Sequence, residues 1–157
     1  FCSNKNAIVY YNIDLVGNLA RTGNWFYNLN EDHQILDRIF QKNSSENLLS
    51  IDASLYQNAG ANSIQQLAYA LAHANEYLNH FFNNDKEVSE KQGILTFQFA
   101  VGPNYFFEIA KIRAFRKLYA ALASEYNCLQ TCHISQKRRF SRTGQSHQYQ
   151  YFAILDR

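Results

Sequence analysis

The polar stretch SLYQN at residues 54–58 stands where chemistry would be expected, because it closes an alternating, strand-like run, LLSIDASL at 48–55. In α/β proteins, binding and reacting groups gather at the carboxyl ends of parallel strands. Yet this stretch contains no acid, no base and no metal ligand. The sequence therefore predicts a site position here that lacks a catalytic group of its own.

A second candidate position is the segment GNLARTGN at residues 17–24, which holds a single arginine, Arg21. The segment has two glycines but lacks the spacing and the lysine of a phosphate-binding loop. An exposed guanidinium can hold a carboxylate or a phosphate through two parallel hydrogen bonds. Arg21 is therefore a candidate anion-binding residue, and a loop arginine in a surface ion pair is the alternative.

The cysteines and histidines do not follow a metal-site pattern. Cys128, Cys132 and His133 form one cluster, CLQTCH, whereas zinc sites usually combine Cys-x₂-Cys with a second ligand pair. Strand alternation would send Cys132 and His133 to opposite faces, so we expect neither a metal site nor a nucleophile–base pair. Together with Cys2 the cysteine count is odd, which does not suggest a disulfide framework and favours a reducing, cytoplasmic location.

Charge and hydropathy exclude some classes of partner. The net charge is only +2. The basic run QKRRFSR at 136–142 is therefore expected to be a solvated loop, or a loop that contacts the phosphates of a ligand. No apolar run approaches the roughly 20 residues of a membrane span. We therefore expect neither a nucleic-acid nor a membrane partner. The chain begins at Phe1 and contains no methionine, so we expect it to be a piece of a longer product.

The elements that must position these residues alternate along the chain. Strand-like runs occupy 7–11, 48–55, 94–101 and 128–134. Helical patterns fall between them, at 31–42, from Ser63 to about residue 82, and from Pro103 to about residue 125. Ser63 with Gln66 forms a capping box at the start of the second helix. The third helix has Phe107, Ala110, Ala114 and Leu118 on one line, and the cluster of Glu108, Lys111 and Arg113 is expected to be an exposed charged face.

This order predicts an α/β fold of parallel strands joined by crossover helices. Two architectures fit it: a small doubly wound sheet, or about half of a (β/α)₈ TIM-type barrel, which needs roughly 200 residues to close. We expect one domain over 1–157, with residues 135–157 forming a divergent basic tail. Half a barrel would leave two unpaired strand edges, so the isolated chain is expected to oligomerise or to need the rest of its barrel.

Two segments, residues 50–78 and 95–120, resemble the substrate-binding barrel of the methylmalonyl-CoA mutase family. The match spans about residues 48 to 123, and NLARTGNW at 18–25 further resembles the small, non-cobalamin subunit of the bacterial heterodimeric enzymes. The matching motifs are Gln57-x-Ala59-Gly60-Ala61, then Glu76-Tyr77, and then Gly102-x-Asn104 with Glu108-Ile109-Ala110-Lys111-x-Arg113-Ala114-x-Arg116. The resemblance implies the barrel rather than the doubly wound sheet.

The resemblance also implies a function. The family is a two-domain isomerase that interconverts methylmalonyl-CoA and succinyl-CoA by radical chemistry, with the acyl-CoA threaded through the barrel and adenosylcobalamin held by a second domain. The catalytic chain has a histidine that contacts the thioester where this sequence has Leu55, and an arginine where it has Ile94. Leucine and isoleucine donate no hydrogen bond. Two polar substrate contacts are therefore replaced by aliphatic side chains.

Other residues keep a substrate-binding role by resemblance. Arg21 corresponds to an arginine that would hold the free carboxylate of the substrate, and Gln57 and Asn104 are carried over from the matched motifs. No residue is expected to be catalytic. The cobalamin lower-ligand motif Asp-x-His-x-x-Gly is absent, so this chain is expected to bind no cobalamin.

We therefore expect a small-subunit-like barrel fragment, inactive alone, that pairs with a larger catalytic mutase subunit in a heterodimer and stabilises it. The alternatives are an acyl-CoA-binding module and an isomerase acting on a different acyl-CoA.

Overall fold

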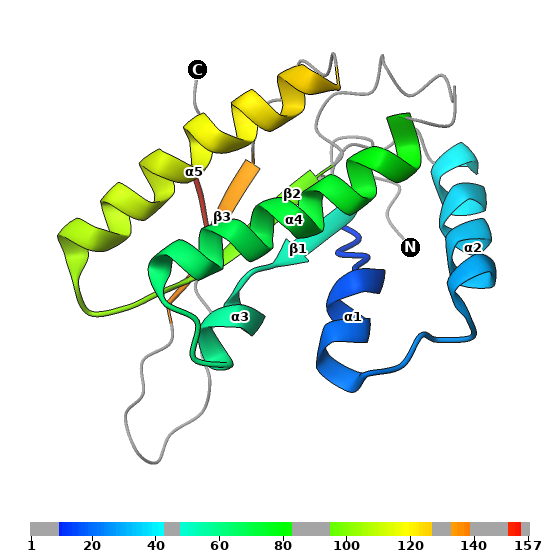
Figure 1. The fold of residues 1–157 in the computed structure, drawn as a ribbon, viewed down its shortest axis with the longest axis horizontal. Coiled ribbons are helices and arrows are strands. Elements are labelled where there is room, and N and C mark those ends of the chain that lie inside the picture. Colours follow the sequence, from blue (N-terminus) through cyan, green and yellow to red (C-terminus); the bar gives the residue numbers. More distant parts are fainter. Residues whose placement is uncertain (1–9, 43–47, 83–94, 127–132, 139–150, 155–157) are drawn as a thin grey trace, which may run out of the picture.

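The computed structural model describes residues 10–42, 48–82, 95–126, 133–138 and 151–154 (Figure 1). Within these ranges helices come before and between the parallel strands. In chain order they are α1 (Leu15–Thr22), α2 (Leu29–Lys42), β1 (Leu49–Asp52), α3 (Ser54–Asn58), α4 (Ser63–Phe82), β2 (Leu95–Val101), α5 (Tyr105–Glu125), β3 (His133–Arg138) and β4 (Tyr151–Ile154). No helix in these ranges is both long enough and apolar enough to cross a membrane.

The strands form one sheet in the order β1-β2-β3-β4. β1 pairs with β2 in parallel, and β2 pairs with β3 in parallel, with Ile51 opposite Phe97 and Phe97 opposite Ile134. Figure 1 shows α4 and α5 side by side over one face of this sheet. The predicted α/β class with parallel strands joined by helices is thereby confirmed, and the arrangement is consistent with part of a (β/α)₈ barrel.

β4 departs from the expected parallel order, because it pairs with β3 in the antiparallel direction. The sequence pattern predicts no strand in this part of the basic tail. Ile134 lies opposite Ile154 and Lys137 opposite Tyr151. The pairing gives β3 a partner on the edge that a further parallel strand would take in a barrel.

The first predicted strand is largely absent from the described residues. Residues 7–9 lie outside them, and Tyr10 and Tyr11 form no strand. Only Ile13 makes a parallel bridge to Leu49, through hydrogen bonds with Leu48 and Ser50. Asn12 adopts φ 53°, a left-handed backbone that asparagine tolerates better than most residues and that interrupts extended structure.

Two helices were not predicted from the sequence, because both are short. α1 begins after Asp14, whose carboxylate accepts a hydrogen bond from the Gly17 N–H, and it ends at Gly23 with φ 76°. Asp14 and Gly23 are only nine positions apart, so the helix between them is too short for a periodic pattern of apolar residues to be recognised. α3 follows β1 almost directly, although the sequence pattern predicts that the strand continues to residue 55.

The core lies between the sheet and α4 and α5. Phe97 and Phe99 of β2 contact the ring of Phe115 edge-on, with centroids 4.7 and 4.8 Å apart. Near the C-terminal end of α4, the ring of Phe81 stacks on that of Phe40 in α2, with the ring centroids 4.6 Å apart. These aromatic residues bury large areas, which accounts for much of the high phenylalanine content of the chain.

The orientation of α5 differs from the expected one. Its buried side carries Lys111, Ile112, Phe115, Tyr119 and Ala123. The predicted line of Phe107, Ala110, Ala114 and Leu118 lies on the exposed side instead. Both sides of the helix are apolar, so periodicity alone did not decide which side faces the sheet.

Candidate functional site

The candidate site is the edge of the sheet where the parallel strands end. β1 ends at Asp52 and β2 at Val101, and the parallel register places these two carboxyl ends on the same edge. The parallel bridge of Ile13 to Leu49 brings Asp14 and the start of α1 to that edge as well. α1, α3 and the start of α5 therefore lie at that edge, as the sequence predicted for strand ends.

Arg21, in the last turn of α1, is tied to this edge by Asp52. Its Nη2 lies 2.9 Å from Asp52 Oδ2, and the two side chains are 46% and 18% exposed. The other oxygen of Asp52 accepts hydrogen bonds from the backbone N–H and the hydroxyl of Ser54 at the start of α3. Asp52 thus joins α1 to α3. The ion pair proposed as the alternative role of Arg21 is therefore present. Substrate binding by Arg21 stays a prediction.

Asp14 organises a buried polar cluster beside this ion pair. Its Oδ1 accepts from the Gly17 N–H at 2.8 Å and from the Tyr77 hydroxyl at 3.1 Å, and its Oδ2 from the Asp52 N–H at 3.4 Å. Nε2 of His73 lies 2.9 Å from the same Oδ1, a contact that becomes an ion pair when the imidazole is protonated. One carboxylate thereby holds together α1, β1 and α4.

The environment fixes the protonation of this cluster. Burial opposes ionisation of Asp14, but the charge and close contact of His73 and the N–H groups of Gly17 and Asp52 outweigh it and lower the pKa of the carboxyl. Burial and the Asp14 charge raise the pKa of the Tyr56 and Tyr77 hydroxyls. Asp14 is thus held as a carboxylate, and both tyrosines keep their protons.

His73 is a member of this cluster that sequence reasoning missed. The helical spacing placed His73 and His80 on one face of α4, read as solvent or a neighbouring helix. In the structure the His73 side chain is 1% exposed, and its Nδ1 lies 3.1 Å from the Tyr56 hydroxyl. The only available signal was the i,i+4 spacing of His73 and Tyr77, because Asp14 is 59 positions earlier in the chain.

The other predicted site residues are placed differently from one another. Gln57 lies in α3, where its Oε1 is buried and has no hydrogen-bond partner among the described residues. Asn104 caps α5, with its Oδ1 accepting from the Phe107 N–H at 3.3 Å. Leu55 is partly buried in α3, and Ile94 lies outside the described residues. Substrate binding by Gln57 and Asn104 also stays a prediction.

The expected exposed charged face of α5 is partly wrong, because Lys111 is buried. Its Nζ lies 2.5 Å from Glu108 Oε2, 3.1 Å from Gln66 Oε1 and 3.0 Å from the carbonyl oxygen of Ala100. Glu108 also accepts from the Gly102 N–H at 3.1 Å. These bonds fix the turn after β2 against the first turn of α4. Arg113 is exposed, as expected.

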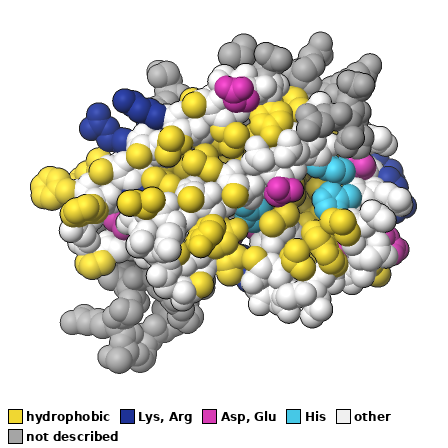
Figure 2. Space-filling model, viewed as in Figure 1, with side chains coloured by type: hydrophobic (Ala, Val, Ile, Leu, Met, Phe, Trp, Pro, Cys, Tyr) yellow, Lys and Arg dark blue, Asp and Glu magenta, His cyan; other side chains and the backbone are white. Residues whose placement is uncertain are grey.

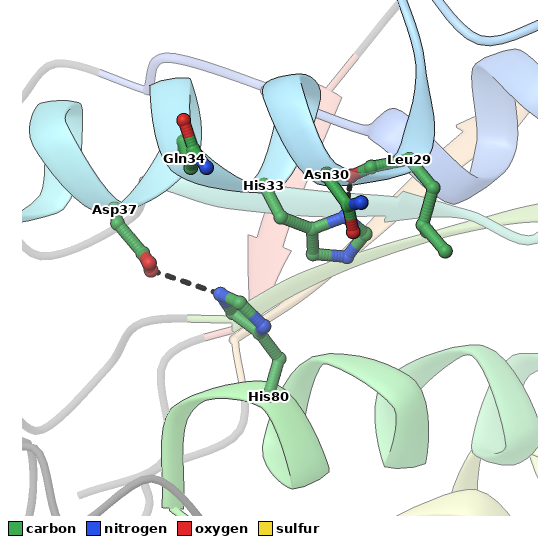
Figure 3. Close-up of a pocket in the computed structure, with 6 residues that line it drawn as sticks. All are labelled: Leu29, Asn30, His33, Gln34, Asp37 and His80. Carbon is green, nitrogen blue, oxygen red and sulfur yellow. Dashed lines mark hydrogen bonds and ion pairs between the residues drawn. The ribbon is translucent and has the colours of Figure 1, made fainter.

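A shallow pocket of about 430 Å³ lies between α2 and the last turn of α4 (Figure 3). His80 faces Asp37 there, with Nε2 and Oδ1 2.8 Å apart, and its ring lies 4.7 Å from that of His33. The pocket is at the end of α4 away from α3, so it does not belong to the strand-end edge. The described residues contain no group of three or more acidic, histidine or cysteine side chains that could hold a metal ion. Cys128 and Cys132 lie outside these residues.

The family model for methylmalonyl-CoA mutase matches residues 9–151, which is most of the chain. The chain belongs to the methylmalonyl-CoA mutase family. It is 42% identical over 80 residues to the methylmalonyl-CoA mutase of Cereibacter sphaeroides, covering 51% of this chain and 11% of that protein. It is 38% identical over 79 residues to the small subunit of the Porphyromonas gingivalis enzyme, covering 50% of this chain and 13% of that subunit.

A large subunit is similar to the same degree. The chain is 38% identical over 87 residues to the methylmalonyl-CoA mutase large subunit of Streptomyces virginiae, covering 55% of this chain and 12% of that subunit. The chain therefore spans about a tenth of the length of the mutases and mutase subunits it matches. The comparisons support membership of the mutase family and leave the type of subunit undetermined.

The described residues of this mutase-family chain do not fit the lower ligand of cobalamin. His73 is enclosed by Asp14 and Tyr56, and His80 contacts Asp37. Nδ1 of His33 lies 2.7 Å from the carbonyl oxygen of Leu29. None of the three follows an aspartate by two positions, as the lower-ligand motif requires. No step of the reaction is therefore assigned to cobalamin on these residues.

Proposed function

We propose that this chain is about half of the substrate barrel of a methylmalonyl-CoA mutase-family subunit of the small, non-cobalamin type. In this proposal it contributes to the interconversion of methylmalonyl-CoA and succinyl-CoA by stabilising a larger catalytic subunit that carries adenosylcobalamin. It supplies no catalytic group itself. The expected location is the cytoplasm, where the acyl-CoA substrates and the partner subunit would meet it.

The observation that carries this proposal is Leu55 at the carboxyl end of β1. At this position a hydrogen-bond donor would be needed to hold a thioester carbonyl, and a leucine side chain has none. Leaving such a polar group unpaired in a closed site costs about 1–3 kcal/mol. A site with this residue binds and orients an acyl-CoA poorly.

The bonding of the remaining polar groups supports the same view. Arg21 is paired with Asp52, and the Asn104 side-chain oxygen caps α5. The carboxylate of Asp14 is engaged with α1 and α4. These groups bond to other parts of the fold at the strand-end edge, as expected for a subunit with a structural rather than a catalytic role.

The test is to purify the chain with and without the larger mutase subunit from the same source and to measure isomerisation. Co-purification is expected, turnover should require the larger subunit, and Arg21→Ala should leave turnover of the complex within about twofold of the unmodified complex. Lys42→Ala, which removes an exposed positive charge at the end of α2, is the matched control. Rapid turnover by the chain alone, or loss of all turnover in an intact complex carrying Arg21→Ala, would refute the proposal.

A second candidate function, binding of an acyl-CoA without catalysis, is favoured by Gln57. Its buried Oε1 lacks a partner among the described residues, and the pantetheine arm of CoA carries amide N–H donors. Lys137 and the following basic residues up to Arg142 would then meet the CoA phosphates. Calorimetric titration of CoA into the chain distinguishes this function, because heat that is lost in Gln57→Leu supports it and no heat at millimolar CoA removes it.

A further inference from the structure

The outward side of the α4–α5 pair carries many exposed apolar side chains, and Glu125 near the end of α5 is the acidic residue among them. Figure 2 shows hydrophobic side chains spread across both helices on this side. On α5, Ala114 is exposed and Leu118 is 47% exposed, and on α4, Ile64 is 79% exposed. The other exposed alanines here are Ala68, Ala72, Ala110 and Ala121. We call this the α4–α5 face.

An apolar outer face is unusual for a surface helix, whose solvent side is normally polar. Apart from its two histidines, α4 carries a single acidic or basic residue over its twenty positions, Glu76. Contiguous exposed apolar surface of this kind marks an interaction site. Its many alanines suit another helix, because small residues let two helix backbones approach closely.

The charges on the two margins of this face have opposite signs. On α4, Tyr69 contacts Tyr56 of α3 with ring centroids 5.2 Å apart, so Tyr69 marks the margin away from α5. Glu76, seven residues later, lies on the same margin, because seven residues are close to two helical turns. Glu76 is exposed. The α4 margin is therefore acidic.

The opposite margin, on α5, is basic. Lys111 marks the side of α5 toward α4, because its ammonium reaches Gln66. Arg113 is rotated from it by about 200° and Lys117 by about 240°, counting 3.6 residues per turn. Both are exposed and lie on the far margin.

From this arrangement we infer that the α4–α5 face binds a second copy of the same chain. A two-fold axis running along the helices lays α4 of one copy over α5 of the other. It brings the acidic margin of each copy to the basic margin of its partner, and it covers the apolar strip between them. A self-complementary patch of this kind is what an isologous two-fold interface requires. The inference concerns the chain by itself and does not depend on the proposed function.

The experiment is sedimentation velocity of the purified 157-residue chain over a range of concentrations. A dimer is expected. Ala114→Glu places a charge in the centre of the face and should raise the dimer dissociation constant about tenfold or more. Gln41→Glu, which adds the same charge on the exposed surface of α2, is the matched control and should leave the constant unchanged. Circular dichroism confirms that each variant is folded.

A charge exchange makes the test specific to this geometry. Glu76→Lys and Lys117→Glu should each weaken the dimer, and the double variant should recover most of its affinity. A monomer at all concentrations, or a dimer unaffected by Ala114→Glu, would overturn the inference. A monomeric chain whose co-purification with a larger mutase subunit is lost in Ala114→Glu would overturn it too, because the face would then belong to that subunit.

Discussion

At the scale of single residues, Asp14 connects more of the site than any residue predicted from the sequence. Its carboxylate caps α1 at Gly17, accepts a hydrogen bond from Tyr77 and lies against His73. The Tyr77 hydroxyl in turn lies 2.8 Å from the Leu15 N–H and 3.2 Å from the Val16 N–H. The first N–H groups of α1, which no helical carbonyl can satisfy, are therefore satisfied by two side chains.

Gly17 is the residue whose replacement tests this cap most directly. A Cβ added at Gly17 would lie 2.1 Å from Asp14 Oδ2, so the carboxylate would have to move. Gly17→Ala is therefore expected to lower the free energy of unfolding by about 1–2 kcal/mol, the usual value of a lost helix cap. Urea denaturation measures this. Ala20→Ser in the same helix is the control and should change stability by less than about 0.5 kcal/mol, and an equal effect of both variants would contradict the cap.

The lowered pKa of Asp14 predicts a dependence of stability on pH. A carboxyl that is more acidic in the folded state stabilises the fold fully above its unfolded pKa, about 3.9, and this stabilisation is lost as the pH falls through the folded pKa. Asp14→Asn should therefore be less stable than the unmodified chain at pH 7, and the difference should shrink below about pH 4. Thermal melting of both chains between pH 3 and pH 7 tests this. A difference in stability that does not change with pH would show that ionisation of Asp14 is not the cause of the pH dependence.

At the scale of elements, Lys111 determines how α5 meets the rest of the fold. Its ammonium joins α5 to Gln66 of α4 and to the last residues of β2, next to the turn that leads to Asn104. A buried ammonium is tolerated only with partners of this kind. The ion pair with Glu108 thus fixes the turn after β2, where one of the predicted site residues lies.

Removal of this ammonium should therefore be costly. Lys111→Met leaves the Glu108 carboxylate, 15% exposed, without its cation, and it should lower the free energy of unfolding by about 3 kcal/mol. The double variant Lys111→Met with Glu108→Gln should recover part of this loss, since no unpaired charge remains. Urea denaturation of both variants tests the pair. Equal stability of the single and double variants would mean that the carboxylate is solvated rather than buried.

At the scale of the whole molecule, the sheet covers one of the two edges that a half barrel would expose. β4 pairs with β3, and β1 is bridged by Ile13 on its other side. The sequence predicts two unpaired edges, with the chain either associating through them or needing the rest of its barrel. The structure places apolar surface on the α4–α5 face instead, so association is expected through helices.

The role of β4 is open to test by truncation. A chain ending at residue 138 lacks β4 and exposes the edge of β3, so it should form more aggregate than the complete chain. A chain ending at residue 154 keeps β4 and serves as the control. Static light scattering of the two truncated chains compares them, and equal scattering would show that β4 does not protect the edge.

The fold was predicted from the sequence to the extent that its signals are local. The strands at 49–52 and 95–101 and the helices at 29–42, 63–82 and 105–125 lie within a few residues of their predicted bounds. Each carries its own apolar period or cap, such as Asn104 before α5. α1 and α3 were missed because eight and five residues are too short to show a helical period. The direction of β4 depends on its partner strand and has no signal within its own four residues.

By itself, then, the sequence determined the alternation of helices and strands, the resemblance to the mutase family and the aliphatic residue at position 55. Tertiary structure alone decided that Arg21 pairs with Asp52, that His73 joins Asp14, that Lys111 is buried and that an apolar side of α5 remains exposed. The physical reason is range. Helical periods and caps act over three or four residues, whereas the bonds that join Asp14 and α1 to β1 and α4 connect residues 31 to 63 positions apart, and only the folded chain brings them together.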